Sequence, residues 1–280
     1  MKKLRSDRFS GERALFASKD LSIEDSLFFD GESPLKESSG INLHRCVFQW
    51  KYPLWYCKNI DAAECTLLDT ARSGIWYTEN INMTDCEIKA PKTFRRSSHI
   101  SLRNVRMTDA SETMWNCDNV ELSDVYVLGD YFGMGCCDII ADRLNVDGNY
   151  LFDGGKNIVI RNSRLISKDA FWNCENVTVI DSVIVGEYLG WNSKNLTFIN
   201  CDIESNQGMC YIRDLTMKGC RLNNTDLCFE YCTVDAEINS DIISVKNPIS
   251  GRIVADRIGE IIMDPECVDV TKTEIIEVKK

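Results

Sequence analysis

The sequence lacks any long apolar run. None of its hydrophobic stretches approaches the roughly 20 residues that a membrane-spanning helix needs, so we expect no membrane span. The opening segment, Met1–Gly11, is charged where a secretory signal would be apolar. The chain also lacks CxxC pairs and has only two histidines, His44 and His99. We therefore expect no metal site and no other cofactor.

Several catalytic signatures are missing as well. There is no GxGxxG opening a helix, no P-loop and no GxSxG elbow, and two histidines leave little for a Ser–His or Cys–His system. The net charge of −11 repels phosphate backbones and anionic lipid, so we expect neither nucleic acid nor a membrane as a partner. Fourteen cysteines without an export signal favour free thiols in a reducing compartment, and hence a cytoplasmic protein.

What the sequence does contain is an internal repeat. Its unit reads Asn–apolar–x–apolar–x–x–small–x–apolar, as in Asn59–Leu67, Asn80–Ile88 and Asn119–Val127. The first apolar residue of each unit serves as a marker, and successive markers are 19 to 21 residues apart. The markers are Leu21, Ile41, Ile60, Ile81, Ile100, Val120, Ile139, Ile158, Val177, Leu196, Leu215 and Val234. Ile253 lies a further 19 residues on and extends the series.

The repeat length selects the architecture. Apolar residues alternate with period two within each unit, which is typical of strands. A unit of 19 to 21 residues is too short for a strand–helix pair, and the leucine-dense consensus of leucine-rich repeats is absent. The pattern predicts an all-β protein, a right-handed parallel β-helix of about 12–13 coils. We expect a single domain over 1–280, with an N-terminal cap at 1–11, regular coils at 12–234, and irregular last coils with a C-terminal cap at 235–280.

Two columns of equivalent residues have structural explanations. The residue before the marker is usually Asn, which tolerates the left-handed conformation of a tight turn and can form an amide ladder along the stack. Another column holds only small residues, Ser or Cys, which suit a narrow interior. We therefore assign these asparagines to turns and these cysteines to packing, rather than to a ligand site or to catalysis.

A third strand is predicted six or seven residues before each marker, and its flanks are unusual. The position just after its apolar residue carries Trp55, Trp76, Arg95 and Trp115 in successive coils. The next position carries Arg96, Trp172 and Trp191. Because strand side chains alternate, we assign these to two columns, one facing in and one facing out, and the sequence leaves open which. If the first column faces out, Arg95 lies between two indoles in cation–π contact.

These residues support a binding hypothesis. Exposed aromatic side chains can stack on sugar rings, and a basic cluster can clamp an anionic sugar or a phosphate. The alternative is that the aromatics belong to the core or protect the flank of the sheet. The candidate ligand-binding residues are Trp55, Trp76, Arg95, Arg96, Trp115, Arg72, Trp172 and Trp191. The leading function is thus the binding of a carbohydrate-like or small anionic ligand along an aromatic and charged strip.

Two other functions stay open. Glu112 and Asp130 lie on neighbouring coils of a charged column, and with Asp153 and Asp169 they are candidate catalytic residues of a glycoside hydrolase or lyase. The same column could equally be a salt-bridge ladder, and nearby positive charges disfavour a general acid. The third function is a structural or assembly scaffold, a homo-oligomer in which coils stack end to end or sheets pair.

Several long segments resemble a bacterial family known only as domain of unknown function 3737. These segments are FSGERALF (Phe9–Phe16), DGESPLKES (Asp30–Ser38), WKYPLWYC (Trp50–Cys57), GDYFGM (Gly129–Met134), KDAFWNCEN (Lys168–Asn176) and SVKNP (Ser244–Pro248). The resemblance covers nearly the whole chain. It implies a right-handed β-helix similar to the pectin-lyase-like superfamily, but no established activity and no catalytic residues.

Overall fold

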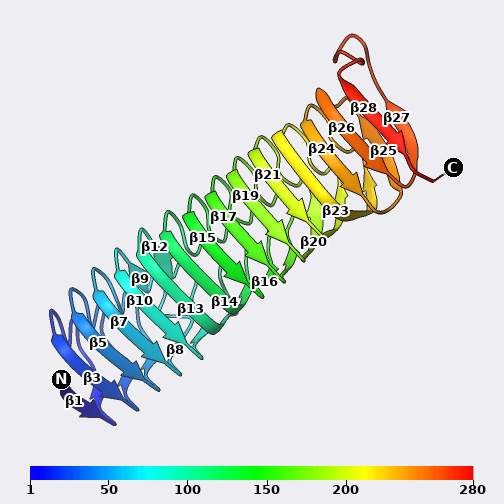
Figure 1. Ribbon diagram of the computed structural model, residues 1–280. Coiled ribbons are helices and arrows are strands. Elements are labelled where there is room, and N and C mark those ends of the chain that lie inside the picture. The colour runs from blue at the N-terminus through cyan, green and yellow to red at the C-terminus, as the bar shows by residue number, and fades with distance from the viewer. Residues whose placement is uncertain (280) are drawn as a thin grey trace. The chain divides into compact units, whose positions relative to one another are not determined.

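The protein is built entirely from strands and the turns between them. A computed structural model describes residues 1–279, and every regular element in that range is a strand (Figure 1). The chain divides into two units, Met1–Asn145 and the part from Val146 onward. Within each unit the strands repeat turn after turn and run parallel to one another.

The first unit contains the strands from β1 to β15. They are β1 (Lys2–Arg5), β2 (Arg8–Phe9), β3 (Lys19–Glu24), β4 (Leu27–Phe28), β5 (Ser39–His44), β6 (Val47–Phe48), β7 (Lys58–Ala63), β8 (Thr66–Leu67), β9 (Ile75–Trp76), β10 (Glu79–Thr84), β11 (Glu87–Ile88), β12 (Phe94–Arg95), β13 (Ser98–Met107), β14 (Asp118–Leu128) and β15 (Cys137–Asp142). Strand β16 (Asn145–Asp147) falls at the division.

The second unit contains the strands from β17 to β28. They are β17 (Lys156–Arg161), β18 (Arg164–Ile166), β19 (Glu175–Ile180), β20 (Val183–Glu187), β21 (Lys194–Ile199), β22 (Asp202–Asn206), β23 (Arg213–Asp226), β24 (Thr233–Ile238), β25 (Ile242–Lys246), β26 (Ser250–Ala255), β27 (Ile258–Ile262) and β28 (Thr273–Glu277).

The strand register confirms the predicted fold. Marker residues pair with one another in parallel: Leu21 with Ile41, then Ile41 with Ile60, and in the second unit Val177 with Leu196. The chain is a parallel β-solenoid of about 15 turns with a period near 19 residues, as the right-handed β-helix prediction required. It has more turns than the 12–13 expected, because β1 and β28 add a strand before the first marker and one after the last.

The register departs from the sequence period near the end of the second unit. Val234 pairs with Gly251, and Ile253 pairs with Ala236. The prediction that Ile253 continues the marker series is therefore wrong. The turn between β24 and β26 is two residues shorter than the others, so that equal spacing in the sequence places Ile253 one strand position pair beyond the marker. The cap and single-domain boundaries remain predictions.

The turn before each marker is formed as the Asn column predicts. Asn59, Asn80, Asn157, Asn176 and Asn195 all have positive φ. The side-chain amide of each turn donates to the amide oxygen of the previous turn, from Asn80 to Asn59 at 2.7 Å and from Asn195 to Asn176 at 2.8 Å. The turn and the ladder thus use the same residue type for two reasons.

The small column is buried and satisfies backbone carbonyls. The hydroxyl of Ser26 donates to the carbonyl of Glu24 at 2.7 Å, and that of Ser182 donates to the carbonyl of Ile180 at 2.7 Å. All fourteen cysteines are free. Burial raises the pKa of Cys57 and of Cys174 to about 12, so both remain thiols at neutral pH and serve packing.

The Asn ladder generates a stability prediction in the second unit. Asn176 donates to Asn157 and accepts from Asn195, with φ of 59°. Asn176→Ala should lower the free energy of unfolding by about 1–3 kcal/mol, because alanine is strained in the left-handed region and makes neither bond. Asn176→Gly keeps the turn and should lose clearly less. Urea unfolding measures both, and equal losses would show that the left-handed turn does not matter.

Candidate functional site

The five tryptophans of the third strand form one type of position in the turn. Counted back from the marker, Trp55, Trp76 and Trp115 in the first unit and Trp172 and Trp191 in the second all lie five residues before it. All five are half-buried. The assignment of Trp172 and Trp191 to a second, oppositely facing column is therefore wrong. The error arose because the apolar position used as reference shifts by one residue along the chain.

Each indole lies flat along the stack and is tied to the next turn. The Nε1–H groups of Trp76, Trp115 and Trp172 donate to backbone carbonyls 16 residues further on, at 2.7–2.8 Å. Trp55 donates in the same way to the carbonyl of Ser73 at 2.5 Å. Since the indole nitrogens are satisfied within the protein, these side chains hold successive turns together.

The faces of the first-unit indoles are covered by their neighbours. Trp55 and Trp76 stack with their ring centroids 5.1 Å apart and an angle of 9° between the rings. The guanidinium of Arg95 lies 4.8 Å from the ring centroid of Trp76 and 4.4 Å from that of Trp115. The predicted position of Arg95 between two indoles is confirmed. A sugar ring cannot stack on faces that are already occupied, so the tryptophans offer mainly their edges.

Arg95 has hydrogen-bonding capacity left over. Its Nε and Nη2 atoms are buried and have no hydrogen-bond partner. The nearest carboxylate is that of Glu112, with an oxygen 3.7 Å from Nη2, and Glu112 also pairs with Lys92 at 3.1 Å. A guanidinium has five donors and binds carboxylates and phosphates well when two of them are used together. Arg95 is therefore a cation held rigidly in place with its donors incompletely used.

The next position in the turn carries the exposed part of this surface. Tyr56 and Tyr77 are 46% and 37% exposed, and their rings stack 4.8 Å apart. Arg96 follows in the next turn and is also exposed. All three have positive φ, which a bulky side chain adopts only with strain and which Asn and Gly adopt easily. In the second unit the same position holds Asn173 and Asn192, as local stability would favour.

We define the aromatic–basic strip as Tyr56, Trp76, Tyr77, Arg95 and Arg96 of the first unit. Arg72 is exposed in the turn that precedes Trp76. Lys36 adds a further cation, with its ammonium 5.6 Å from the ring centroid of Tyr56. Sequence reasoning singled out the tryptophans and arginines but not the two tyrosines. Their signal was available, since they fill a turn position where Asn recurs elsewhere.

The four candidate catalytic carboxylates are not brought together as one group. Glu112 and Asp130 lie on neighbouring turns of the first unit, where the Glu112 amide donates to the Asp130 carbonyl at 2.9 Å. Glu112 pairs with Lys92, as the salt-bridge interpretation of the column predicts. Asp153 and Asp169 belong to the second unit. Asp153 accepts a hydrogen bond from the Asn173 amide at 2.8 Å.

Asp169 is the most unusual of these carboxylates. The residue is buried, and its Oδ1 atom has no hydrogen-bond partner. Burial raises the pKa of Asp169, against the opposing effects of a hydrogen bond from Tyr150 and the charge of Lys168. Lys168 itself is paired with Glu187 at 3.1 Å. Asp169 therefore occupies a site where the ionised form is poorly compensated.

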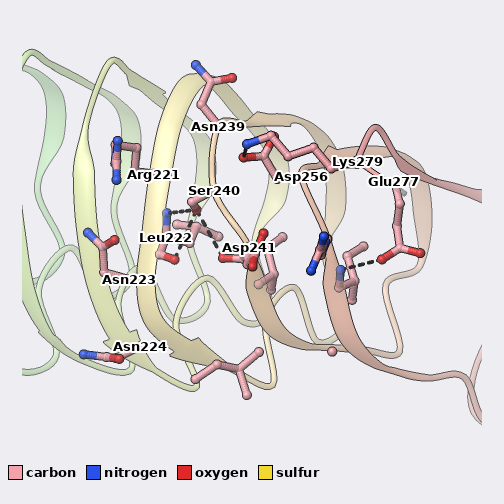
Figure 2. Close-up of a pocket in the computed structure, with 15 residues that line it drawn as sticks. Arg221, Leu222, Asn223, Asn224, Asn239, Ser240, Asp241, Asp256, Glu277 and Lys279 are labelled. Carbon is pink, nitrogen blue, oxygen red and sulfur yellow. Dashed lines mark hydrogen bonds and ion pairs between the residues drawn. The ribbon is translucent and has the colours of Figure 1, made fainter.

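A groove in the last turns was not anticipated from the sequence (Figure 2). It has a volume of about 890 Å³ and is lined by the end of β23, the segments on either side of β25 and β27, and the residues after β28. Figure 2 shows Lys279 reaching Asp256, and Glu277 accepting a hydrogen bond from the Ile258 amide at 2.7 Å. The loss of a regular period in this part of the chain hid the groove.

The contacts in this groove bind the last turns to one another. The Ser240 hydroxyl accepts from the Leu222 amide at 2.9 Å and links two further turns. Within residues 1–279 no group of three or more His, Cys, Asp or Glu side chains is arranged to hold a metal ion. In the same range no helix is long and apolar enough to cross a membrane. The groove is thus a polar surface of paired charges.

Comparison with protein families identifies the chain. A profile of the family described as "Protein of unknown function (DUF3737)" matches residues 2–276. The chain belongs to the DUF3737 family. The resemblance suggested by the sequence segments is confirmed. A search of curated proteins found no similar sequence.

Solved structures similar to this DUF3737 protein share little sequence with it. The surface protein and adhesin PfbA of Streptococcus pneumoniae is 9% identical, with 99% of this chain and 91% of that one covered and a TM-score of 0.49. The A-module of mannuronan C-5 epimerase AlgE4 from Azotobacter vinelandii is also 9% identical, with 99% and 85% covered and a TM-score of 0.34. A double mutant of the tailspike protein of E. coli bacteriophage HK620 is 8% identical, with 92% and 66% covered and a TM-score of 0.42. Similarity at this level assigns no ligand.

The stacked indoles of the DUF3737 protein lead to a stability prediction. Trp76→Ala should lower the free energy of unfolding by about 2–4 kcal/mol, because it removes the stack on Trp55, the contact with Arg95 and the hydrogen bond to the Lys92 carbonyl. The matched variant is Tyr77→Ala, one residue on and exposed, which should cost less than about 1 kcal/mol. Denaturant unfolding measures both. Equal effects of the two variants would contradict a structural role for the indole ladder.

Asp169 leads to a prediction about pH. A carboxyl with a raised pKa binds its proton more tightly in the folded state, so the free energy of unfolding falls as pH rises through and above the ordinary value of 3.8. Asp169→Asn removes this titration. The variant should therefore gain stability relative to wild type between pH 3 and pH 7. Denaturant unfolding across that range measures the gain, with Asp235→Asn, an exposed carboxyl in β24, as control. A pH-independent difference would show that Asp169 is not destabilised by burial.

Proposed function

We propose that this DUF3737 protein is a binding module, and that the aromatic–basic strip of its first unit binds an anionic carbohydrate. The observation that carries the proposal is Arg95. Its guanidinium is clamped between two indoles, and two of its nitrogens have no hydrogen-bond partner. A cation that is fixed in advance loses little conformational entropy when it binds an anion.

The neighbouring residues define the class of ligand. Arg96 and Arg72 are exposed and extend the positive surface on a chain whose net charge is −11. Tyr56 and Tyr77 add exposed aromatic edges with hydroxyl groups, which can contact a sugar ring and hydrogen-bond to its hydroxyls. A uronic-acid oligosaccharide combines carboxylates with apolar ring faces and matches both features. The strained conformation of Tyr56, Tyr77 and Arg96 is further support, because local stability does not account for these residues.

The open surface also favours binding over catalysis. Glu112, the carboxylate nearest to Arg95, is held by two cations, and the first unit offers it Asp130 on the next turn as a carboxylate partner. A glycosidase needs one carboxyl that keeps its proton near neutral pH, and two cations favour loss of that proton. The proposal therefore assigns Glu112 to positioning Arg95 and Lys92.

The proposal is tested by calorimetric titration with a galacturonic-acid tetrasaccharide, using a neutral glucose tetrasaccharide of the same length for comparison. Wild type should bind the acidic oligosaccharide, and binding should weaken as salt screens the arginines. Arg96→Ala and Tyr77→Ala should each raise the Kd about fivefold or more, since each removes about 1 kcal/mol or more of interaction.

Tyr211→Ala is the matched control, because Tyr211 lies in the equivalent turn position of the second unit and is 40% exposed. It should leave the Kd unchanged. Equal binding of the neutral oligosaccharide would contradict the anionic part of the proposal. Absence of binding by either oligosaccharide, or a Kd that is insensitive to Arg96→Ala and Tyr77→Ala, would show that the strip is not the site.

A further inference from the structure

The first turn of the first unit presents an uncovered strand edge. β1 pairs in parallel with β3 on one side, and no other strand among residues 1–279 pairs with its second edge. The inward-facing residues of this turn are correspondingly open. Leu4 pairs with Ile23, which is fully buried, yet Leu4 itself is only half-buried. Phe9 likewise stacks on the buried Phe28 on one face only, with the ring centroids 4.8 Å apart.

The last turn of the second unit has a complementary opening. β28 pairs in parallel with β26, and no other strand among the described residues pairs with its second edge. Ile275 pairs with Ile253, which is fully buried, while Ile275 remains half-buried. Each end of the ladder therefore carries an unpaired row of backbone groups and an apolar residue that one more turn would cover. Such edges are templates for pairing with another chain.

The two open edges carry opposite charges. β1 reads Lys2-Lys3-Leu4-Arg5, and β28 reads Thr273-Glu274-Ile275-Ile276-Glu277. Lys2 and Lys3 form no ion pair with any residue in the range 1–279, while Arg5 pairs with Asp25 at 3.3 Å. On the other edge, Glu274 lies 3.6 Å from Arg252 and is exposed. Two copies of one edge would repel each other, whereas β1 and β28 attract.

The register of the solenoid aligns these features. Leu4 occupies the inward column that contains Ile23, and Ile275 occupies the column of Ile253, which are the same position of the turn counted along the ladder. If β1 is placed next to β28 in that register, Leu4 covers Ile275, and Lys3 lies directly opposite Glu274. Hydrophobic closure and charge pairing thus require one and the same alignment.

We propose that β28 of one copy pairs in parallel with β1 of a second copy, in the register that places Leu4 on Ile275 and Lys3 opposite Glu274. The contact joins different surfaces of the two copies, so each associated copy still offers one free edge. Association of this heterologous kind continues beyond the dimer unless the arrangement closes into a ring.

The test is sedimentation velocity of the 280-residue chain over a wide range of concentrations, at low and at high salt. Wild type should form dimers and higher species as concentration rises, and salt should weaken them. Lys3→Glu and Glu274→Lys should each reduce association at least tenfold, because each places like charges opposite one another. Mixed in equal amounts, the two variants should associate again, since the reversed edge of each meets the native edge of the other.

Arg164→Glu is the control, because it makes the same change of charge at an exposed position of β18, within the second unit. It should associate like wild type. Leu4→Asp provides an independent variant that blocks the apolar closure, and circular dichroism checks that each variant is folded. The proposal is overturned by a wild-type monomer at every concentration, by a species that stops at two copies, or by variants that associate normally or fail to recover on mixing.

Discussion

The backbone hydrogen bonds between equivalent residues of successive turns are the interaction on which every other feature of this protein depends. In a parallel ladder they keep the register constant, so that each side chain meets the residue at its own position one turn earlier and one turn later. A residue is therefore selected for how it stacks on its equivalents. Asn176 both donates to and accepts from the asparagines next to it, and Phe28 stacks on Phe48 at 4.6 Å. Residue types that elsewhere indicate chemistry, such as cysteine and asparagine, here satisfy this requirement.

The same constraint decides which aromatic residues are available to a ligand. Parallel stacking at strand spacing brings neighbouring rings face to face, and the faces of Trp55 and Trp76 are consumed in this way. What projects from the surface is the residue at the turn that follows, where Tyr77 and Arg96 stand at positive φ. The tryptophans thus act as a rigid base that positions Arg95, and the exposed residues beside them form the surface on which the proposed binding depends.

A ladder also has ends, and its ends cannot satisfy themselves. A closed fold uses every strand edge, whereas a solenoid repeats until the chain stops and leaves one edge at its first strand and one at its last. In this chain the first edge is rich in lysine and arginine, and the last is rich in glutamate. The half-buried Leu4 and Ile275 occupy a column whose other members are buried. Self-association through these edges follows from the same register that builds the turns.

The sequence by itself determined the repeat, the strand periodicity, the left-handed Asn turns and the packing role of Ser26 and Cys57, because each of these depends on local residue type and constant spacing. It also placed Arg95 between two indoles, since stacking makes neighbours of residues one period apart. Only the tertiary structure decided that Trp172 lies in the same position as Trp76, and that Ile253 is out of step with Val234. The reason is that a turn can absorb an extra or a missing residue without a change in the apolar pattern, so register is fixed by hydrogen bonds between turns and not by counting along the chain.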